Sequence, residues 1–526
     1  MKPVVEIFDS TLRDGAQGEG ISFSVEDKLA VARLLDGLGV AFIEAGNPGS
    51  NPKDLEFFRR AGELKLRNSR LVAFGSTRRK GIRAEEDANV QALLTAGTDA
   101  VALFGKCWDL HVRDILQTTE EENFAMIADT VAFFKKKGRR VIFDAEHFFD
   151  GYKANPPFAM KALEAAADAG ADVLTLCDTN GGAFPQEVYD ITRAVAERFG
   201  ATVGIHTHND GGMAVANSIM AVSAGAAHVQ GTYLGFGERS GNANLSTIIP
   251  NLQLKLGYAC IPQDNMPLLT ATARSMAEVA NIRLGRGEPY VGSSAFAHKA
   301  GMHADGVLKN SSSFEHINPD AVGNERRFLM SEVSGRGAVL EKIRRFCPAI
   351  RKSSPELKTI IDELKRMELE GYQYEGADGS FELLVRKCLG QLNPYFDLVY
   401  YRITGEMPHE PDQSAVATLK VRVGDQSQIA AGEGNGPVNA LDKALRSALA
   451  GFYPSLANVH LVDYKVRVMD SKQATAARVR VLITSTDGVR EWTTVGVAGD
   501  VIEASWAALS DSIEYKLVSD GEAAAG

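Results

Sequence analysis

Two histidines separated by one residue are the strongest chemical signal in the sequence. His206 and His208 belong to the segment HTHND, residues 206–210, at the end of a predicted strand over 202–207. Residues i and i+2 of a strand point to the same side, so both imidazoles can face one cavity. Paired imidazoles are favoured ligands of transition metals. The pattern therefore predicts a metal site, with a pair of hydrogen-bonded core histidines as the alternative.

Four further polar segments carry groups that could act with these histidines. They are 9–17 (DSTLRDGAQ), 144–147 (DAEH), 177–182 (CDTNGG) and 235–244 (GFGERSGNAN). The first combines an arginine with two carboxylates and an amide, and the second offers a carboxylate that could act as a base. The glycines of the last could let the backbone approach a ligand. Each segment alone could equally be an ordinary polar turn.

The elements that position these segments alternate along the first half of the chain. Short runs rich in Val, Ile and Phe predict strands over 4–8, 41–45, 71–75, 100–104, 140–145, 172–177, 202–207 and 229–234. Amphipathic stretches between them predict helices, one opened by Ser24 with Asp27 three residues later. Eight such units match a TIM (β/α)8 barrel, whereas a doubly wound sheet would need a glycine-rich fingerprint that is absent. All five polar segments follow a predicted strand and should therefore meet at the carboxyl-end mouth of the barrel.

The rest of the chain has two further regions with different patterns of predicted helices and strands. We expect the barrel over 1–270, helical linker subdomains over 271–390, a C-terminal domain over 391–520 and a flexible tail over 521–526. The linker contains a helix opened by Ser-Ser-Pro at 353–355. The C-terminal domain is predicted to be α+β with an internal duplication, because strands, a glycine turn and a helix occur twice.

Composition narrows the class of protein. The 526 residues include 57 Lys and Arg against 67 Asp and Glu, a net charge of −10. A chain of that sign has no general attraction to nucleic acid or anionic lipid. Five scattered cysteines without a CxxC pair indicate neither a disulfide framework nor a zinc–thiolate site. These features, with no apolar run long and pure enough for a membrane span, predict a cytoplasmic enzyme with a small-molecule substrate.

Three of the motifs together resemble a known family. The segments 8–15 (FDSTLRDG), 206–210 (HTHND) and 237–242 (GERSGN) are similar to those of the metal-dependent enzymes that condense an acyl-CoA with a 2-oxo acid. That family contains 2-isopropylmalate, homocitrate and citramalate synthases. The segment 298–303 (HKAGMH) resembles the linker motif of the family, and the C-terminal repeat resembles its regulatory dimerisation domain. The segments 18–24, 44–54 and 146–156 are most similar to the citramalate synthase subgroup.

The resemblance implies roles for individual residues. It places a divalent cation, Mg²⁺, Mn²⁺ or Zn²⁺, on four ligands: Asp14, His206, His208 and Asn242. It assigns Arg13 to the developing alkoxide, Thr179 to the carboxylate of the 2-oxo acid and Gln17 to the same pocket. Glu146 and His303 are the implied bases.

The reaction implied by the resemblance joins acetyl-CoA to pyruvate, in isoleucine biosynthesis, by a homodimer whose His303 reaches the neighbouring subunit's site. Isoleucine is the expected feedback effector. Another condensing synthase, of the 2-isopropylmalate or homocitrate type, differs only in the side chain of the oxo acid, and Leu103, Phe104 and Phe143 are expected to line that pocket. The long C-terminal domain argues against an aldol-type lyase. The presence of all four proposed ligands with Arg13 and Glu146 argues against a non-catalytic metal-binding regulator.

Overall fold

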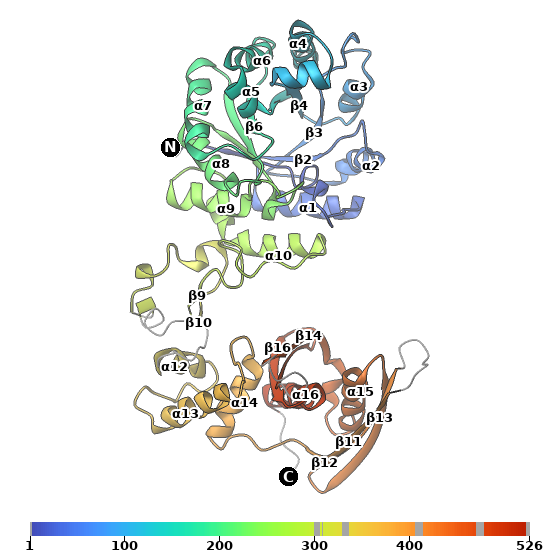
Figure 1. Ribbon diagram of the computed structural model, residues 1–526, viewed down its shortest axis with the longest axis vertical. Coiled ribbons are helices and arrows are strands. Elements are labelled where there is room, and N and C mark those ends of the chain that lie inside the picture. Colours follow the sequence, from blue (N-terminus) through green and yellow to red (C-terminus); the bar gives the residue numbers. More distant parts are fainter. Residues whose placement is uncertain are drawn as a thin grey trace. The chain divides into compact units, whose positions relative to one another are not determined.

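Eight parallel strands close into a barrel in the N-terminal half of the computed structural model (Figure 1). The strands are β1 (Glu6–Asp9), β2 (Phe42–Gly46), β3 (Arg70–Ser76), β4 (Ala100–Lys106), β5 (Arg140–Glu146), β6 (Val173–Asp178), β7 (Thr202–Thr207) and β8 (His228–Gly231). Each strand pairs with the next, and β8 pairs with β1 to close the ring. The predicted TIM barrel is confirmed.

The structure describes residues 3–298, 306–307, 309–328, 336–405, 414–469 and 478–521. They form two compact units, one made of residues up to Phe296 with Ile317–Arg326, the other of Ala297–His316 with the chain from Arg327 onward. His303 and the tail beyond Gly521 lie outside the described residues. The expected domain boundaries at 270 and 390 stay predictions.

Helices surround the barrel and cover the outer faces of its strands (Figure 1). They are α1 (Val25–Leu38), α2 (Pro52–Arg60), α3 (Ala88–Thr95), α4 (Glu120–Lys136), α5 (Phe148–Ala154), α6 (Pro156–Asp168), α7 (Pro185–Arg198), α8 (Ala214–Ser223) and α9 (Leu245–Pro250). A further helix, α10 (Leu269–Val279), packs against α1. The predicted cap of α1 is confirmed as a full capping box: the Asp27 N–H donates to Ser24 Oγ, and the Ser24 N–H donates to Asp27 Oδ2.

Alternation along the strands separates two apolar cores. One face fills the inside of the barrel, with Phe8, Phe42 and Ile142 among its members, while the other packs beneath the helices. Leu103 and Phe143 belong to the outer core, so the expectation that they line the substrate pocket is wrong. Both point outward because they alternate with inward neighbours, and of the three expected residues Phe104 alone faces the cavity.

The eighth strand is shorter than the predicted 229–234. It ends at Gly231, and Tyr233 and Leu234 enter a turn in which Leu234 adopts a left-handed φ of 64°. The Tyr233 side chain is buried and its hydroxyl donates to the Leu269 carbonyl, 2.8 Å away. Tyr233 and Leu234 therefore have the composition of a strand end but belong to a turn. This turn directs the loop over 235–244 back across the mouth of the barrel.

The second unit contains the predicted duplication. It begins with β9 (Ala297–His298), β10 (Arg327–Phe328), α12 (Arg336–Arg344), α13 (Pro355–Leu369) and α14 (Asp378–Cys388). Three antiparallel strands and a helix then follow as β11 (Asp397–Gly405), β12 (Ala415–Val423), β13 (Gln426–Gly434) and α15 (Pro437–Leu449), and the same order recurs as β14 (His460–Val468), β15 (Val479–Thr486), β16 (Glu491–Ala498) and α16 (Val501–Ser519). The helix expected after 353–355 is α13. Across the described ranges, no helix has both the length and the apolar composition that a membrane crossing requires.

Candidate active site

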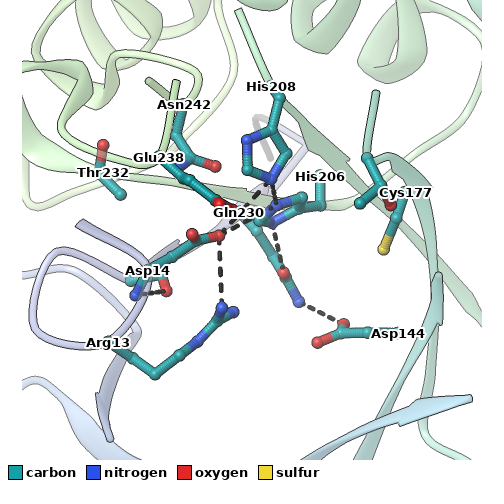
Figure 2. A network of polar contacts seen from close by, with 12 residues as sticks. Arg13, Asp14, Asp144, Cys177, His206, His208, Gln230, Thr232, Glu238 and Asn242 are labelled. Atoms are coloured by element: carbon teal, nitrogen blue, oxygen red, sulfur yellow. Dashed lines mark hydrogen bonds and ion pairs between the residues drawn. The ribbon is translucent and has the colours of Figure 1, made fainter. Parts of the chain in front are cut away.

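Three buried side chains from opposite ends of the barrel sequence meet at its mouth (Figure 2). His206 is on β7, His208 is the first residue after that strand, and Asp14 lies in the loop after β1. The two Nε2 atoms are 3.2 Å apart, and Asp14 Oδ2 lies 3.4 Å from His206 Nε2 and 3.8 Å from His208 Nε2. The prediction that both imidazoles face one cavity is confirmed, and the carboxylate of Asp14 joins them.

Asn242 fits the same cluster as an oxygen donor. A backbone bridge pairs it with His208, and its Nδ2 donates to the Phe236 carbonyl at 3.2 Å. Its Oδ1 is buried and has no hydrogen-bond partner among the described residues, which is costly unless a ligand satisfies it. A Cβ on Gly237 would lie 2.2 Å from Asn242 Nδ2, so only glycine leaves this amide in place. Two imidazole nitrogens and two oxygens suit a divalent cation.

Two members of the cluster have the charge states that metal binding needs. Burial lowers the pKa of the third, His206, but the hydrogen bond and charge of Asp14 outweigh burial and raise that pKa. Burial raises the pKa of Asp14, but Arg13 and the two imidazoles outweigh burial and hold that pKa well below its usual range. Burial, assisted by His206, lowers the pKa of His208 to about 3. Asp14 is therefore an anion and His208 a neutral imidazole at pH 7, the forms in which these groups bind metal.

Arg13 is held in a partly buried position next to the cluster. Its Nε donates to Glu44 Oε2 at 2.7 Å, its Nη1 lies 3.4 Å from Asp14 Oδ2, and its guanidinium carbon stands 3.7 Å from the centre of the Phe74 ring. Glu44, in the middle of β2, is fully buried and also accepts a hydrogen bond from Ser10 Oγ. Glu44 was not predicted as a site residue, although a carboxylate inside an otherwise apolar predicted strand was a usable signal.

A cavity of about 240 Å³ opens over these groups. Its walls are formed by Arg13, Asp14, Gln17, Phe74, Phe104, Asp144, Glu146, Cys177, Thr179, His206, His208, Glu238 and Arg239. The expected site residues other than Asn242 and His303 therefore line one cavity. Asn242 is buried beside it (Figure 2).

The far wall of the cavity carries Glu146 and Thr179. Glu146 is the last inward residue of β5 and forms an ion pair with Lys106. The next residue, His147, adopts a left-handed φ of 54° and turns the chain away, so that Glu146 alone of this pair faces the cavity. The His147 N–H donates to Thr179 Oγ at 2.9 Å, which leaves the hydroxyl hydrogen of Thr179 able to donate to a substrate oxygen.

Arg239 joins two loops of the mouth. Its Nη2 donates to the Thr179 carbonyl at 2.7 Å and its Nε donates to Asp210 Oδ1 at 2.8 Å. The side chain thus connects the loop after β6 with the loop after β7. The glycine-rich segment that contains Arg239 did not predict this connection, because the connection depends on loops that are distant in sequence.

Because Asp144 is a buried carboxyl group, we expect the stability of the metal-free protein to depend on pH. Burial, with a contribution from Glu44, raises the pKa of this carboxyl to about 7. The folded state therefore keeps a proton that the unfolded state releases near pH 4, so this group lowers the free energy of unfolding as pH rises from about 4 to about 7. The variant Asp144→Asn lacks that loss. We expect the difference in thermal unfolding temperature, variant minus wild type and measured in the presence of chelator, to rise between pH 5 and pH 7 and then level off. A difference that does not change with pH would contradict the raised pKa of Asp144.

Comparison with known proteins agrees with this architecture. The HMGL-like family matches residues 4–272, a homocitrate synthase post-HMGL domain matches 290–371, and the LeuA allosteric (dimerisation) domain matches 375–517. An (R)-citramalate synthase of Aquifex aeolicus is 53% identical over 99% of both chains. One of Geobacter sulfurreducens is 48% identical over 98% of both chains, and a 2-isopropylmalate synthase of Shouchella clausii is 31% identical over 95% of this chain and 94% of its own.

The matched domains account for nearly the whole chain, and the alignment with the Aquifex aeolicus relative covers 99% of each of the two chains. The barrel, the cluster at its mouth and the duplicated C-terminal domain described above correspond to these matches. The chain belongs to the metal-dependent 2-isopropylmalate/homocitrate synthase family, in which it is similar over its full length to the (R)-citramalate synthases.

Proposed function

We infer that the protein is an acyltransferase with the activity of an (R)-citramalate synthase, in which acetyl-CoA, pyruvate and water give citramalate and CoA. The observation that carries the proposal is the convergence of Arg13, Thr179, Glu146 and the Asp14–His206–His208 cluster on one small cavity. These groups match the needs of a 2-oxo acid, which brings a carboxylate and an electrophilic ketone. The similarity to citramalate synthases over the whole chain supports the choice of reaction.

The proposed binding mode uses each group once. Asp14, His206, His208 and Asn242 would hold a divalent cation, which when bound supplies Lewis-acid polarisation of the keto group. The Thr179 hydroxyl donates to the carboxylate of pyruvate, and Gln17 lines the same cavity. Arg13 donates to the ketone oxygen as it gains negative charge during carbon–carbon bond formation. Because Glu44 and Phe74 fix the guanidinium beforehand, little reorganisation accompanies that charge.

Glu146 is the proposed base. Its carboxylate lines the cavity and is oriented by the Lys106 ammonium, so it can accept a proton from the methyl carbon of the acetyl thioester. The carbon nucleophile then attacks the keto carbon of pyruvate, and water cleaves the thioester to release CoA. His303 is the second proposed base and would reach the site of the neighbouring subunit in a homodimer.

Phe104 is proposed to set the size of the accepted oxo acid. Its ring stacks on Phe74 with centroids 5.2 Å apart and closes one wall of the cavity. Phe104→Ala should shift the kcat/KM ratio from pyruvate toward 2-oxo acids with longer side chains, by about tenfold or more per added methylene. The neighbouring variant Leu103→Ala is a matched control, because Leu103 packs in the outer core. It should lower stability and keep the preference for pyruvate, and equal preferences in wild type and Phe104→Ala would contradict the role.

Regulation and assembly form the last part of the proposal. The match to the LeuA allosteric (dimerisation) domain supports a homodimer in which isoleucine, as the end product, inhibits the enzyme. The five free cysteines suit the reducing cytoplasm. Isoleucine titrated into the activity assay should lower the rate of CoA release. A rate that does not change would refute the proposed feedback inhibition.

A CoA-release assay tests the reaction directly. The full-length protein is incubated with acetyl-CoA and, separately, pyruvate, 2-oxoisovalerate and 2-oxoglutarate, each with and without chelator. We expect release with pyruvate that the chelator abolishes. Preference for 2-oxoisovalerate or 2-oxoglutarate would instead assign the chain to the 2-isopropylmalate or homocitrate reaction.

A further inference from the structure

A line of hydrogen bonds runs from the cluster into the wall of the barrel (Figure 2). His206 Nδ1 lies 3.0 Å from Gln230 Oε1, and Gln230 Nε2 donates to Asp144 Oδ1 at 2.8 Å. Gln230 is on β8 and is fully buried, while Asp144 on β5 is 4% exposed. The line thus connects three strands within the barrel and ends on a carboxyl group.

The chemistry of the carboxylate sets the direction of these bonds. Above pH 7, where the buried Asp144 carboxyl is ionised, it only accepts hydrogen bonds, so the Gln230 amide presents its NH₂ group to Asp144. The amide oxygen then faces His206, and because an amide oxygen also only accepts, Nδ1 of His206 must carry the hydrogen. In the neutral ring the lone pair is therefore on Nε2, the atom that faces Asp14 and His208.

Neither Thr175 nor His208 determines the orientation of the Gln230 amide. Thr175 Oγ1 lies 3.3 Å from Gln230 Nε2, but a hydroxyl can donate or accept and cannot dictate which way the amide points. His208 Nδ1 has no hydrogen-bond partner among the described residues. His206 is therefore the imidazole of the pair whose tautomer the surrounding protein determines.

We propose that Gln230 and Asp144 are positioning residues of the metal centre, which hold His206 in its Nδ1–H tautomer so that Nε2 is available to the cation. This inference rests on the metal site of the proposed function. Partners of this kind, which contact a metal ligand and not the metal, typically change metal affinity by about 10- to 100-fold when removed.

Mn²⁺ binding by the full-length protein, measured by competition with a fluorescent chelator at pH 8, tests the proposal. Gln230→Leu removes both hydrogen bonds, and Asp144→Asn lets the amide turn either way, so each should weaken Mn²⁺ binding about 10- to 100-fold. Gln230→Glu keeps an acceptor for His206 Nδ1–H, with the proton between the two carboxyls satisfying Asp144, and should restore affinity. Thr175→Val is the matched control and should bind as wild type does.

The outcomes separate the two proposals. Unfolding temperatures of the metal-free variants identify any that fail to fold, and Gln230→Glu then provides the comparison within the same site. If wild type binds Mn²⁺ and Gln230→Leu and Asp144→Asn bind it equally well, the positioning role is wrong and the metal site stands. The role is also wrong if Thr175→Val loses as much affinity or if Gln230→Glu restores none. If wild type binds no Mn²⁺, the metal site fails and the positioning role fails with it.

Discussion

Replacing His206 with alanine should lower kcat/KM for CoA release by about 10³-fold or more and abolish Mn²⁺ binding at micromolar concentrations. The reason is that the residue offers one of two imidazole nitrogens 3.2 Å apart in a buried cluster, and solvent cannot replace it without disturbing the others. Lewis-acid stabilisation at such a site contributes several kcal/mol, and each 1.4 kcal/mol is about tenfold in rate. Chelation of wild type should reproduce the loss.

A second histidine controls for the substitution itself. His460 begins β14 in the C-terminal unit and is exposed, so His460→Ala should leave both CoA release and Mn²⁺ binding unchanged. Steady-state kinetics and the chelator competition on the two variants provide the comparison. Near-wild-type turnover by His206→Ala would show that the imidazole pair is a structural feature of the core.

Replacing Arg13 with lysine should lower kcat by about 10²- to 10³-fold while Mn²⁺ affinity stays near that of wild type. The guanidinium donates to Glu44 and stacks on Phe74 while it also faces the cavity. A lysine keeps the positive charge but has a single ammonium, which cannot hold Glu44 and reach the developing oxyanion together. The effect should therefore fall on kcat and not on metal binding.

Arg140 offers the same chemical change at the other end of the barrel. It begins β5, where its Nη2 donates to Glu6 Oε2 at 2.6 Å. Arg140→Lys should lower the unfolding temperature and leave kcat as it is. Should both arginine variants lose turnover to the same extent, the loss would reflect weakened folding, and the alkoxide role of Arg13 would be refuted.

Much of the fold was predictable because a barrel repeats one local rule. Each barrel strand is a short, largely apolar run, and several helices open on a recognisable cap such as the Ser24–Asp27 box. Strand eight was misjudged because Tyr233 and Leu234 are apolar for a reason unrelated to pairing: the tyrosine ring is buried and its hydroxyl bonds to α10. A buried turn and a buried strand end have the same composition.

Some residues of the candidate site were also predictable from the sequence, and others were not. His206, His208 and Asp14 were predictable because their spacing and their place after strands express chemistry directly. Glu44 and Gln230 were not predicted, since each lies inside a strand and its role depends on a partner many residues away. The direction of each side chain was equally hidden for Leu103 and Phe143, because one residue of register decides whether a strand position faces the cavity or the helices.

Anomalous diffraction from crystals grown with Mn²⁺ and pyruvate tests the central claim most directly, since it locates the cation without reference to turnover. The account predicts one strong peak at the mouth of the barrel, about 2.0–2.3 Å from Asp14, His206 Nε2, His208 Nε2 and the Asn242 oxygen, with pyruvate beside it. A peak elsewhere in the protein, or pyruvate bound away from these four residues, would contradict it.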